Sequence, residues 1–596
     1  MALLLTVVLF VIMRSHSGIE GSDMKNRSYS WISTAVLVLV GLSIVLTGSA
    51  AAQSADIVVA TDGSGDYTTI QAAIDNANQN NRIQVKSGTY SESFDIDKDL
   101  DIVAPNEATI TPPSSSVSAV AIDSGVEPHL ENLTLRGDNR IGLDARSTTG
   151  DWTATNLEIT GFDFGITTID SEGNWVVTDT TIENVSSRGV SADNSAGSWT
   201  INSSTIRNVS GLGVDAYRIQ DGVIKNTKIQ NITKNEEDDG DGINLYDSSG
   251  NWKINNVDIS DVERKGINAE ETNGTYTPVI QRVTIEGTAD HAIDFAYTKS
   301  DAQITDSTIR DTGDDAIEFK RASGDWKVKN VSIEQSDSHG LGALRQPASS
   351  TAIIRNLTVL DTKRHGVELY NTSGDFEIVD SHISNSGWSG IELSDSTGDW
   401  IVTNSTIENA DDFLIGARRA TGDWQINESK LATDGIAVNA TAAVEGNASY
   451  NYWGAADGPS ETFCGSGGAI GGYNVTMYPY YTDSSLTTLS SATTSGTVQI
   501  ASSCVIPEDI SESNEQELVL TLSQISADGQ SDNITITMPE DVSVKNVGEP
   551  RAIGTPYEVD VTNSGDPIKL NINPDEPKAT VDFVLRVPVE LSSSGD

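Results

Sequence analysis

The chain has 596 residues, with 86 acidic against 37 basic side chains, so its formal net charge at pH 7 is −49. Its apolar content of 37% is enough for a packed core, which separates it from disordered chains. A protein that binds nucleic acid needs a positively charged surface, so this charge excludes nucleic acid as a partner.

Residues 1–52 are predicted to be an over-extended start followed by a secretory signal. The basic segment Met24–Arg27 precedes an apolar run, Trp31–Leu46, and the small residues Ser49–Ala52. That order of charge, apolar run and small-residue cleavage site is typical of exported proteins. No later apolar run is long enough to span a membrane. We therefore expect a secreted or cell-surface protein, monomeric, with no membrane span in its mature part.

A repeat of about 24 residues fills residues 128–455. Its marker is Gly, then Asp, Asn or Ser, then an aromatic residue, as at Trp152, Trp175 and Trp400, and a branched apolar residue follows seven positions later. The strands within each unit are short, rich in β-branched residues and alternate with period two. The position four residues after each marker is polar, mostly Asn or Asp, and this pattern predicts an asparagine ladder. These features predict an all-β chain built on a parallel β-helix of about 13 coils.

The segments on either side of the repeat are predicted to close it and extend it. Residues 53–127 are expected to form an N-terminal cap and the first coils, with a short amphipathic helix from Thr68. Residues 456–504 are expected to be a closing segment and a Ser/Thr-rich linker. Residues 505–596 alternate cleanly and predict a small antiparallel β-sandwich. The only cysteines, Cys464 and Cys504, favour one disulfide in an exported protein, with two free buried thiols as the alternative.

Four successive repeats share an unusual column of polar residues. Two residues before the first inward apolar residue stand His291, Asp315, His339 and His365, so three of the six histidines of the chain share one repeat position. Neighbouring coils of a β-helix lie about 5 Å apart, so we expect this column to line one face. We predict that acidic residues one position after the inward apolar residue, and basic and aromatic residues beside them, bind substrate there. These predicted substrate-binding residues are Asp294, Glu318, Lys320, Arg321, Arg345, Arg364, His365, Glu368, Tyr370 and Trp388.

The same segments resemble a known family. T-A-D-H-A-I-D from Thr288, T-G-D-D-A-I from Thr312, S-H-G-L from Ser338 and H-G-V-E-L-Y from His365 are similar, in order, to motifs of the β-helix polygalacturonases. The residues that this resemblance, with the adjacent column, marks as catalytic are Asp314, Asp315, His339, Asp290 and His291. The chain departs from the family where Glu368 and Tyr370 replace its substrate-binding Arg and Lys, and where His291 replaces its first aspartate.

Other segments are similar to the wider group of pectin-lyase-like right-handed β-helix proteins. Residues 56–90 resemble the N-terminal cap of the secreted enzymes of this group, and Asn451–Ser460 resembles the closing segment of exported β-helix surface proteins. The acidic composition also resembles that of exported surface proteins of halophilic archaea, in which salt screens repulsion between like charges.

These observations predict an exported β-helix protein that binds polysaccharide or a surface glycan, and they extend to a hypothesis of glycoside cleavage by neighbouring carboxylates. Two alternatives stay open, a polysaccharide lyase that uses Arg or Lys as base and a non-catalytic structural or adhesive surface protein. No metal is assigned to the column. The acidic insertion at residues 235–242 is a candidate Ca²⁺ loop, with a solvated acidic loop as the alternative.

Overall fold

The computed structural model describes residues 55–490, apart from 139, 275–276, 461–465, 472–474 and 478, and it gives the strands between 497 and 593 as backbone. The predicted start and signal and both cysteines of the predicted disulfide lie outside the described residues. Within the described part of the chain, no helix is both long enough and apolar enough to cross a membrane.

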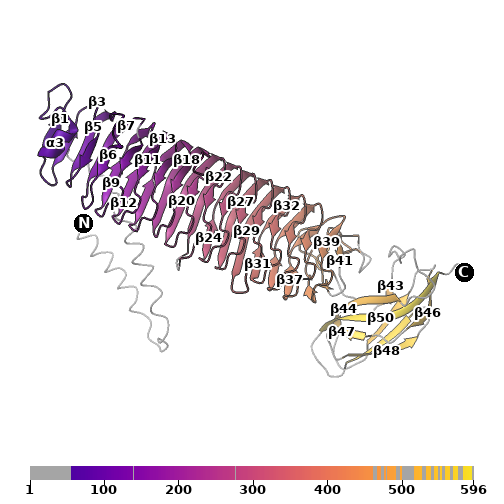
Figure 1. The fold of residues 1–596 in the computed structure, drawn as a ribbon. Helices are drawn as coiled ribbons and strands as arrows, with labels where there is room; N and C mark the ends of the chain where they lie inside the picture. Colours follow the sequence, from indigo (N-terminus) through magenta and orange to yellow (C-terminus); the bar gives the residue numbers. More distant parts are fainter. Residues whose placement is uncertain are drawn as a thin grey trace, which may run out of the picture. The chain divides into compact units, whose positions relative to one another are not determined.

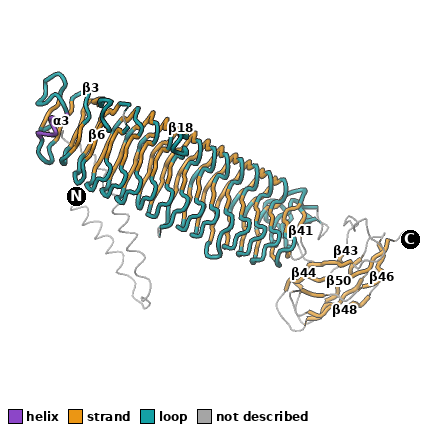
Figure 2. The backbone as a smooth tube through the Cα atoms, in the orientation of Figure 1, coloured by secondary structure: helices purple, strands orange, loops and turns teal. Residues whose placement is uncertain are grey.

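The described coils form a parallel β-helix, in which each coil contributes strands to long sheets that run along one axis (Figure 1). Loops gather between the sheets, as Figure 2 shows. One sheet has 16 strands. Its strands are β4 (Phe94–Ile96), β6 (Ser118–Ile122), β8 (Ile141–Asp144), β11 (Phe164–Thr167), β14 (Arg188–Ser191), β17 (Leu212–Asp215), β19 (Ile243–Asn244), β21 (Ile267–Asn268), β23 (Ile293–Asp294), β26 (Ile317–Glu318), β28 (Leu341–Gly342), β30 (Val367–Glu368), β33 (Ile391–Glu392), β36 (Ile415–Gly416), β39 (Ile436–Asn439) and β41 (Ala469–Gly471).

The remaining strands of the β-helix belong to a second sheet of 26 strands. These are β1 (Ile57–Val59), β2 (Arg82–Val85), β3 (Gly88–Tyr90), β5 (Asp101–Ile110), β7 (His129–Arg136), β9 (Trp152–Thr155), β10 (Glu158–Thr160), β12 (Trp175–Thr178), β13 (Thr181–Val185), β15 (Trp199–Asn202), β16 (Thr205–Ser210), β18 (Gly222–Thr233), β20 (Trp252–Val262), β22 (Val279–Thr288), β24 (Ala302–Thr305), β25 (Thr308–Thr312), β27 (Trp326–Ser336), β29 (Thr351–Thr362), β31 (Asp375–Val379), β32 (His382–Ser386), β34 (Trp400–Thr403), β35 (Thr406–Ala410), β37 (Trp424–Asn427), β38 (Lys430–Ala432), β40 (Gly446–Asn447) and β42 (Val475–Thr476).

The predicted coil count is slightly low. Thirteen repeat markers account for the strands from β8 to β39, but the 16-stranded sheet also contains β4, β6 and β41. These three strands come from residues 94–122 and 469–471, outside the regular repeat, where the marker is absent. A coil needs only one inward apolar strand to pair with its neighbour, so coils continue beyond the range in which the marker recurs.

The core is a stack of equivalent residues from successive coils. Trp152, Trp175 and Trp199 stack with ring centroids 5.6 and 5.2 Å apart, and Trp400 and Trp424 stack at 5.0 Å. All five are buried. Burying one such aromatic side chain removes about 150–250 Å² from water, so the aromatic marker is a packing residue that keeps successive coils in register.

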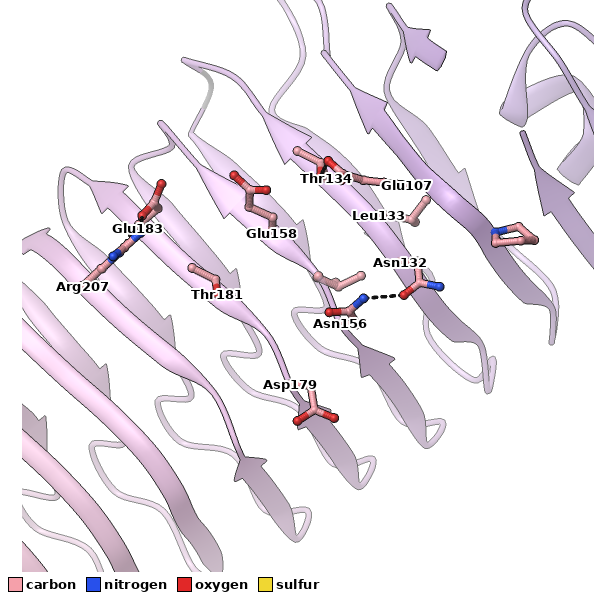
Figure 3. A pocket seen from close by; sticks show the side chains of 12 residues that line it. Glu107, Asn132, Leu133, Thr134, Asn156, Glu158, Asp179, Thr181, Glu183 and Arg207 are labelled. Atoms are coloured by element: carbon pink, nitrogen blue, oxygen red, sulfur yellow. Dashed lines mark hydrogen bonds and ion pairs between the residues drawn. The ribbon is translucent and has the colours of Figure 1, made fainter. Parts of the chain in front are cut away.

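The predicted asparagine ladder is present. Its residues adopt the left-handed conformation, with φ of 55° at Asn330 and 51° at Asn356, which Asn tolerates better than most residues. The side chain of Asn356 donates to that of Asn330 over 3.0 Å, and Asn330 donates to Asp306 over 2.7 Å. Figure 3 shows the bond from Asn156 to Asn132 at the start of the ladder, where a hollow of about 530 Å³ opens beside it. None of the predicted site residues lines that hollow.

The helix predicted at the N-terminal end is α3 (Ile70–Asn76), and its apolar residues Ile70, Ala73 and Ile74 are fully buried. They contact the first coils, so the helix covers apolar surface that would otherwise face water.

The C-terminal strands form two four-stranded sheets. One contains β43 (Thr497–Gln499), β45 (Asp532–Thr537), β48 (Tyr557–Asn563) and β49 (Ile568–Pro574), and the other contains β44 (Gln516–Ile525), β46 (Val542–Val547), β47 (Arg551–Ile553) and β50 (Val581–Ser593). All pairs are antiparallel except β43 with β45. The packing of the two sheets as a sandwich stays a prediction.

Candidate functional site

The pairing of the 16-stranded sheet places the predicted column in line. Ile293 pairs with Ile317, Ile317 with Leu341, and Leu341 with Val367, so the residues two positions earlier stand on consecutive coils. We call residues His291, Asp315, His339 and His365 the polar column. Its alignment, made from sequence spacing alone, is therefore correct.

The column is held together by bonds from side chain to backbone. A carboxylate oxygen of Asp315 accepts the N–H of His339 over 3.0 Å. Nδ1 of His339 accepts the N–H of His365 over 3.2 Å, and Nδ1 of His365 accepts the N–H of Ser389 over 3.0 Å. Each side chain thus satisfies a buried backbone donor of the next coil, which would be costly to leave unpaired.

These bonds determine the tautomer of His339. Because its Nδ1 accepts a hydrogen bond, the neutral ring carries its proton on Nε2. That Nε2 lies 3.2 Å from Oε2 of Glu368. Burial lowers the pKa of His339 to about 3 and that of His365 to about 4, with the like charge of Arg364 adding to both, so both rings are neutral at pH 7.

Two carboxyl groups beside these rings have pKa values near neutrality. Burial raises the pKa of Asp315 to about 6, against the opposing effects of the His339 N–H and the charge on His291. Burial also raises the pKa of Glu368 to about 7, and the charges of Asp315 and Glu392 add to that rise. Groups that titrate between pH 6 and 7 are suited to general acid–base catalysis.

A glycine makes room for the Asp315 carboxylate. In the row of outward residues one position after the inward apolar residue, Gly342 lies between Glu318 and Glu368. A Cβ atom at Gly342 would approach Oδ2 of Asp315 to 2.5 Å, closer than side chains allow. The carboxylate of Asp315 therefore occupies the space that a side chain at position 342 would take. The other predicted aspartate, Asp314, is half-buried and accepts the N–H of Asp315 over 3.0 Å.

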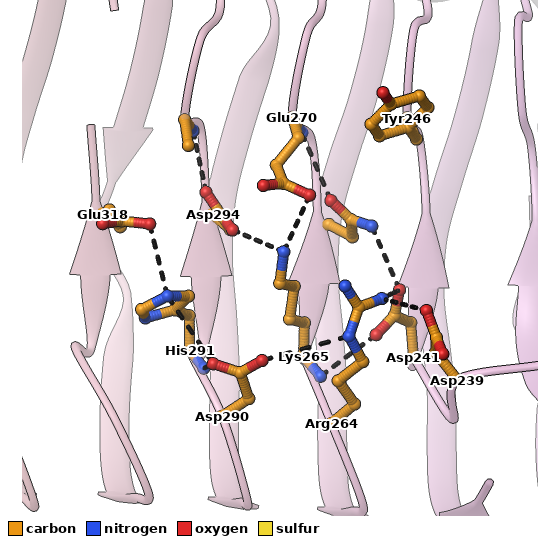
Figure 4. A network of polar contacts seen from close by, with 12 residues as sticks. Asp239, Asp241, Tyr246, Arg264, Lys265, Glu270, Asp290, His291, Asp294 and Glu318 are labelled. Carbon is orange, nitrogen blue, oxygen red and sulfur yellow. Dashed lines mark hydrogen bonds and ion pairs between the residues drawn. The ribbon is translucent and has the colours of Figure 1, made fainter. Parts of the chain in front are cut away.

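His291 differs from the other two histidines because it is paired for a positive charge. Its Nε2 lies 3.2 Å from Oε2 of Glu318 and 3.6 Å from Oδ1 of Asp290 (Figure 4). Burial would lower the pKa of His291, but the Glu318 hydrogen bond and the charges of Asp294 and Glu318 raise it to about 9. His291 is therefore protonated at pH 7, and it serves as a counter-ion rather than a base.

The outward carboxylates of this part of the sheet are buried rather than solvent-facing. Asp294 is 1% exposed and Glu318 is 7% exposed. Nζ of Lys265 lies 2.6 Å from Asp294 and 2.9 Å from Glu270. Lys265 was missed in the sequence, although it stands at the repeat position of the polar column one coil earlier, two residues before Ile267. Extending the column by one repeat would have found it.

The remaining predicted substrate-binding residues lie on the rim. Arg364 stacks over Trp388 at 5.4 Å, and Arg321 lies over Tyr297 at 5.7 Å. Trp388 is 44% exposed and also meets the ring of His365 edge-on at 5.1 Å. The rest of the rim comprises Tyr370 and Arg345, both exposed, and Lys320, which is half-buried with Nζ 3.8 Å from Glu318.

The rim is unusual in its electrostatics. In a chain with a large excess of acid, most arginines of the described coils form an ion pair within 4 Å. Arg321, Arg345 and Arg364 have no such carboxylate partner among the described residues. Three guanidinium groups without a carboxylate partner therefore lie around the polar column, two of them over aromatic rings, and their N–H donors are available to a ligand.

Among the described residues, two clusters of three His, Asp or Glu side chains are close enough to hold a metal ion. In each cluster the possible ligand atoms lie within 4.8 Å of one another, and His291 belongs to both. They are Asp290, His291 and Asp314, and His291, Asp294 and Glu318. The ammonium of Lys265 and the proton of His291 already balance the carboxylates of the second group. In the candidate Ca²⁺ loop, Asp238 forms an ion pair with Arg188 over 3.0 Å, and Asp241 forms one with Arg264 over 2.9 Å. Both carboxylates are therefore already paired with arginines.

Comparison with known proteins identifies the family. The family model described as "Right handed beta helix region" matches residues 118–277, 164–320 and 241–447, which together make more than half of the chain. A search of curated proteins finds no match.

Three solved structures illustrate the likeness in three dimensions. The A-module of Azotobacter vinelandii mannuronan C-5 epimerase AlgE4 is 14% identical, with 52% of this chain and 89% of that chain covered and a TM-score of 0.35. The catalytic unit of a GH87 α-1,3-glucanase from Streptomyces thermodiastaticus is 14% identical, with 73% and 71% covered and a TM-score of 0.28. The tailspike protein gp49 of Pseudomonas phage LKA1 is 10% identical, with 87% and 91% covered and a TM-score of 0.27. These scores lie below 0.5, so the family match carries the assignment: the chain belongs to the right-handed β-helix proteins.

Proposed function

We propose that this chain is an exported protein that binds polysaccharide across the polar column and cleaves a glycosidic bond there. The observation that carries the proposal is the pair Asp315, which is buried, and Glu368, which is half-buried, on the coils either side of that of Gly342; their pKa values are raised to about 6 and 7. The charge of Asp315 contributes to the raised pKa of Glu368. Glycoside cleavage by two carboxyl groups requires one acid and one base with different pKa values.

The roles follow from the protonation states. Glu368, with the higher pKa, is the group that is protonated more often near pH 7, so it would donate a proton to the oxygen of the leaving sugar. Asp315, ionised more often, would take a proton from the attacking water, so that one water is consumed and each new chain end gains a hydroxyl. His339 is a positioning residue, because its Nε2–H is directed at Glu368. Asp314 would keep Asp315 in place through the Asp315 N–H.

The rim supplies the contacts that would hold the polymer. Sugar rings stack on aromatic side chains, and Tyr370 and Trp388 are exposed beside the column. The free guanidinium groups of Arg345 and Arg364 can each donate several hydrogen bonds to sugar oxygens.

Lyase chemistry has less support. It needs a neutral Lys or Arg as base, whereas Asp294 and Glu270 raise the pKa of Lys265 above its ordinary value despite its burial. A non-catalytic surface protein is the second candidate function. It is favoured by the bonds from His339 and His365 to the next coil, which give the polar column a structural role by themselves.

The test is a panel of acidic and neutral polysaccharides incubated with the full chain at low and molar salt. New reducing ends report hydrolysis, and absorbance of unsaturated sugars reports a lyase. We expect hydrolysis that falls at least about a hundredfold in Asp315→Asn and in Glu368→Gln, as expected for loss of a general acid or base. Glu286→Gln, which changes an exposed carboxylate of β22 in the other sheet, should keep full activity. Binding without cleavage would support the surface-protein function. If the chain neither binds nor cleaves any of the polysaccharides, the proposal is refuted.

A further inference from the structure

A second polar pocket lies on the coils that precede the polar column, where the repeat is interrupted, and its lining residue Arg264 reaches Asp290 over 3.9 Å. The step between the coils of β17 and β19 is longer than the usual repeat, and the extra residues include 235–241. They fold back over earlier coils. The side-chain amide of Asn235 donates to the carbonyl of Ser210 and, over 3.3 Å, to that of Ser186.

The loop is fastened by a buried ion pair. Asp238, which is 7% exposed, accepts from Ser187 over 3.1 Å and from Arg188 over 3.0 Å, and both lie about 50 residues earlier in the chain. Arg188 also pairs with Asp215 and Asp193. The insertion is therefore a fixed wall, held by charge-assisted hydrogen bonds, and not a free acidic loop.

The wall borders an open pocket of about 460 Å³, a size typical of small-ligand sites. Its floor is a hydrogen-bonded row of three outward residues. The amide of Asn244 donates to Asp215 over 2.8 Å, and that of Asn268 donates to Asn244 over 3.3 Å. Such a row presents several donors and acceptors at fixed spacing.

Two tyrosines line the same cavity. Tyr217 and Tyr246 come from adjacent coils and stack with ring centroids 5.9 Å apart at 24°. Both are half-buried. A polar floor beside an aromatic wall is the chemistry that recognises a sugar, because the hydroxyl groups of a sugar form hydrogen bonds and its C–H face packs on a ring.

The charge of the cavity restricts which sugar can enter. Its lining contains seven carboxylates against two guanidinium groups, those of Arg188 and Arg264. An acidic sugar would meet like charge here and be rejected. The carboxylates Asp238 and Asp241 are held by Arg188 and Arg264. Burial raises the pKa of Asp241 to about 6 and that of Asp215 well above its ordinary value.

We infer that the cavity between the 235–241 loop and the Tyr217–Tyr246 stack binds one sugar residue that carries no acid group, such as a neutral hexose or an amino sugar. The floor residues Asp215, Asn244 and Asn268 lie four, three and two coils from Glu318, or roughly 10–20 Å at the spacing of neighbouring strands. If the proposed function holds, it would anchor a more distant residue of the same polymer. The sugar-binding inference itself does not require cleavage.

The test uses ligand-observed NMR on the full chain with methyl glycosides of glucose, glucosamine and glucuronic acid. We expect binding of the first two and no binding of the third. Tyr246→Ala should weaken binding at least about fivefold, in line with the loss of an aromatic contact. Tyr450→Ala removes an exposed tyrosine that lines neither site and should leave this binding unchanged, whereas sensitivity to Tyr370→Ala would place the bound glycoside at the polar column.

A double substitution of exposed residues tests the same inference without the risk that the variant fails to fold. Glu237 and Asp239 are exposed on the wall, so Glu237→Lys with Asp239→Lys changes the charge of the cavity without touching its floor. We expect this variant to lose glucosamine and to admit glucuronic acid. Three results would each overturn the inference. The unaltered chain binds the glucuronic acid glycoside, it binds none of the three glycosides, or binding is sensitive to Tyr370→Ala and not to Tyr246→Ala. If the monosaccharides bind but no polymer is cleaved, the inference stands while the proposed function fails.

Discussion

At the residue scale, the polar column shows how one side chain can be structural and chemical together. His339 uses Nδ1 to accept the N–H of His365 and Nε2 to contact Glu368. The first bond fixes the orientation of the ring, and the second directs its proton. The ring can therefore influence Glu368 only because the backbone of the next coil fixes the ring.

Replacing His339 tests the structural part of this role. His339→Ala leaves the buried N–H of His365 without an acceptor, so we expect the free energy of unfolding to fall by about 1–3 kcal/mol. The measurement is denaturant unfolding at pH 7. His382→Ala is the matched variant, because His382 pairs with Glu408 over 3.1 Å at the surface and its loss should cost less than about 1 kcal/mol. Equal effects of the two changes would contradict the structural role.

The raised pKa values of Asp315 and Glu368 also predict a dependence of stability on pH. A carboxyl group whose pKa is raised on folding binds its proton more tightly in the folded state, so its stabilising contribution is full at low pH and is lost as pH rises through the folded value. For these two residues the loss falls between about pH 4 and pH 7. His339 and His365, whose pKa values are lowered, act in the opposite direction, since they destabilise as pH falls below about 6.5.

The two effects are separated by a difference measurement. The double variant Asp315→Asn, Glu368→Gln should gain stability relative to the unaltered chain as pH rises from 5 to 8, by about 4 kcal/mol, because about three units of pKa shift fall in this range and each corresponds to about 1.4 kcal/mol. Unfolding at several pH values measures this. A stability difference that stays constant across the range would show that neither group titrates there.

At the scale of the element, the two-residue strands of the 16-stranded sheet set the geometry of the site. In β23, β26, β28 and β30 the first residue points into the core, and in three of these strands the second residue carries a carboxylate. Gly342, the second residue of β28, is the exception. Its missing side chain leaves the space that the Asp315 carboxylate occupies from the turn before β26.

Gly342→Ala should therefore displace Asp315. The added Cβ would lie 2.5 Å from Oδ2 of Asp315, so the carboxylate must move and lose its position beside Glu368. We expect a cost of about 1–3 kcal/mol in stability and a loss of any hydrolytic activity comparable with that of Asp315→Asn. Gly435→Ala is the control, because its Cβ would meet nothing closer than 3.6 Å. Unchanged activity in Gly342→Ala would remove Asp315 from the proposed mechanism.

At the scale of the whole molecule, the excess of 49 negative charges opposes the compact state. Salt shortens the range of this repulsion from about 10 Å at 0.1 M to about 3 Å at 1 M. We expect the melting temperature to rise as NaCl is increased from 0.1 to 2 M, and KCl to act equally if screening is the cause. A melting temperature that falls, or that does not change, would show that the charge is already compensated.

The sequence by itself determined the scaffold, because each coil repeats the same local instructions. The spacing from Trp152 to Trp175 to Trp199 fixes the stacked core, and the column containing Asn330 and Asn356 fixes the turn, so both could be predicted. The line of the polar column followed from the same spacing, since strands of a parallel sheet pair in register.

Only the tertiary structure decided how the side chains of different coils meet. Spacing could not show that Asp294 is buried against Lys265, nor that Asp315 fills the space over Gly342. It also could not show that Asp238, in the acidic insertion, turns back to Arg188 and makes that insertion the wall of a pocket. The physical reason is that burial, protonation and ion pairing depend on neighbours about 24 residues away in the chain and on the direction each side chain takes, which a repeat pattern does not specify.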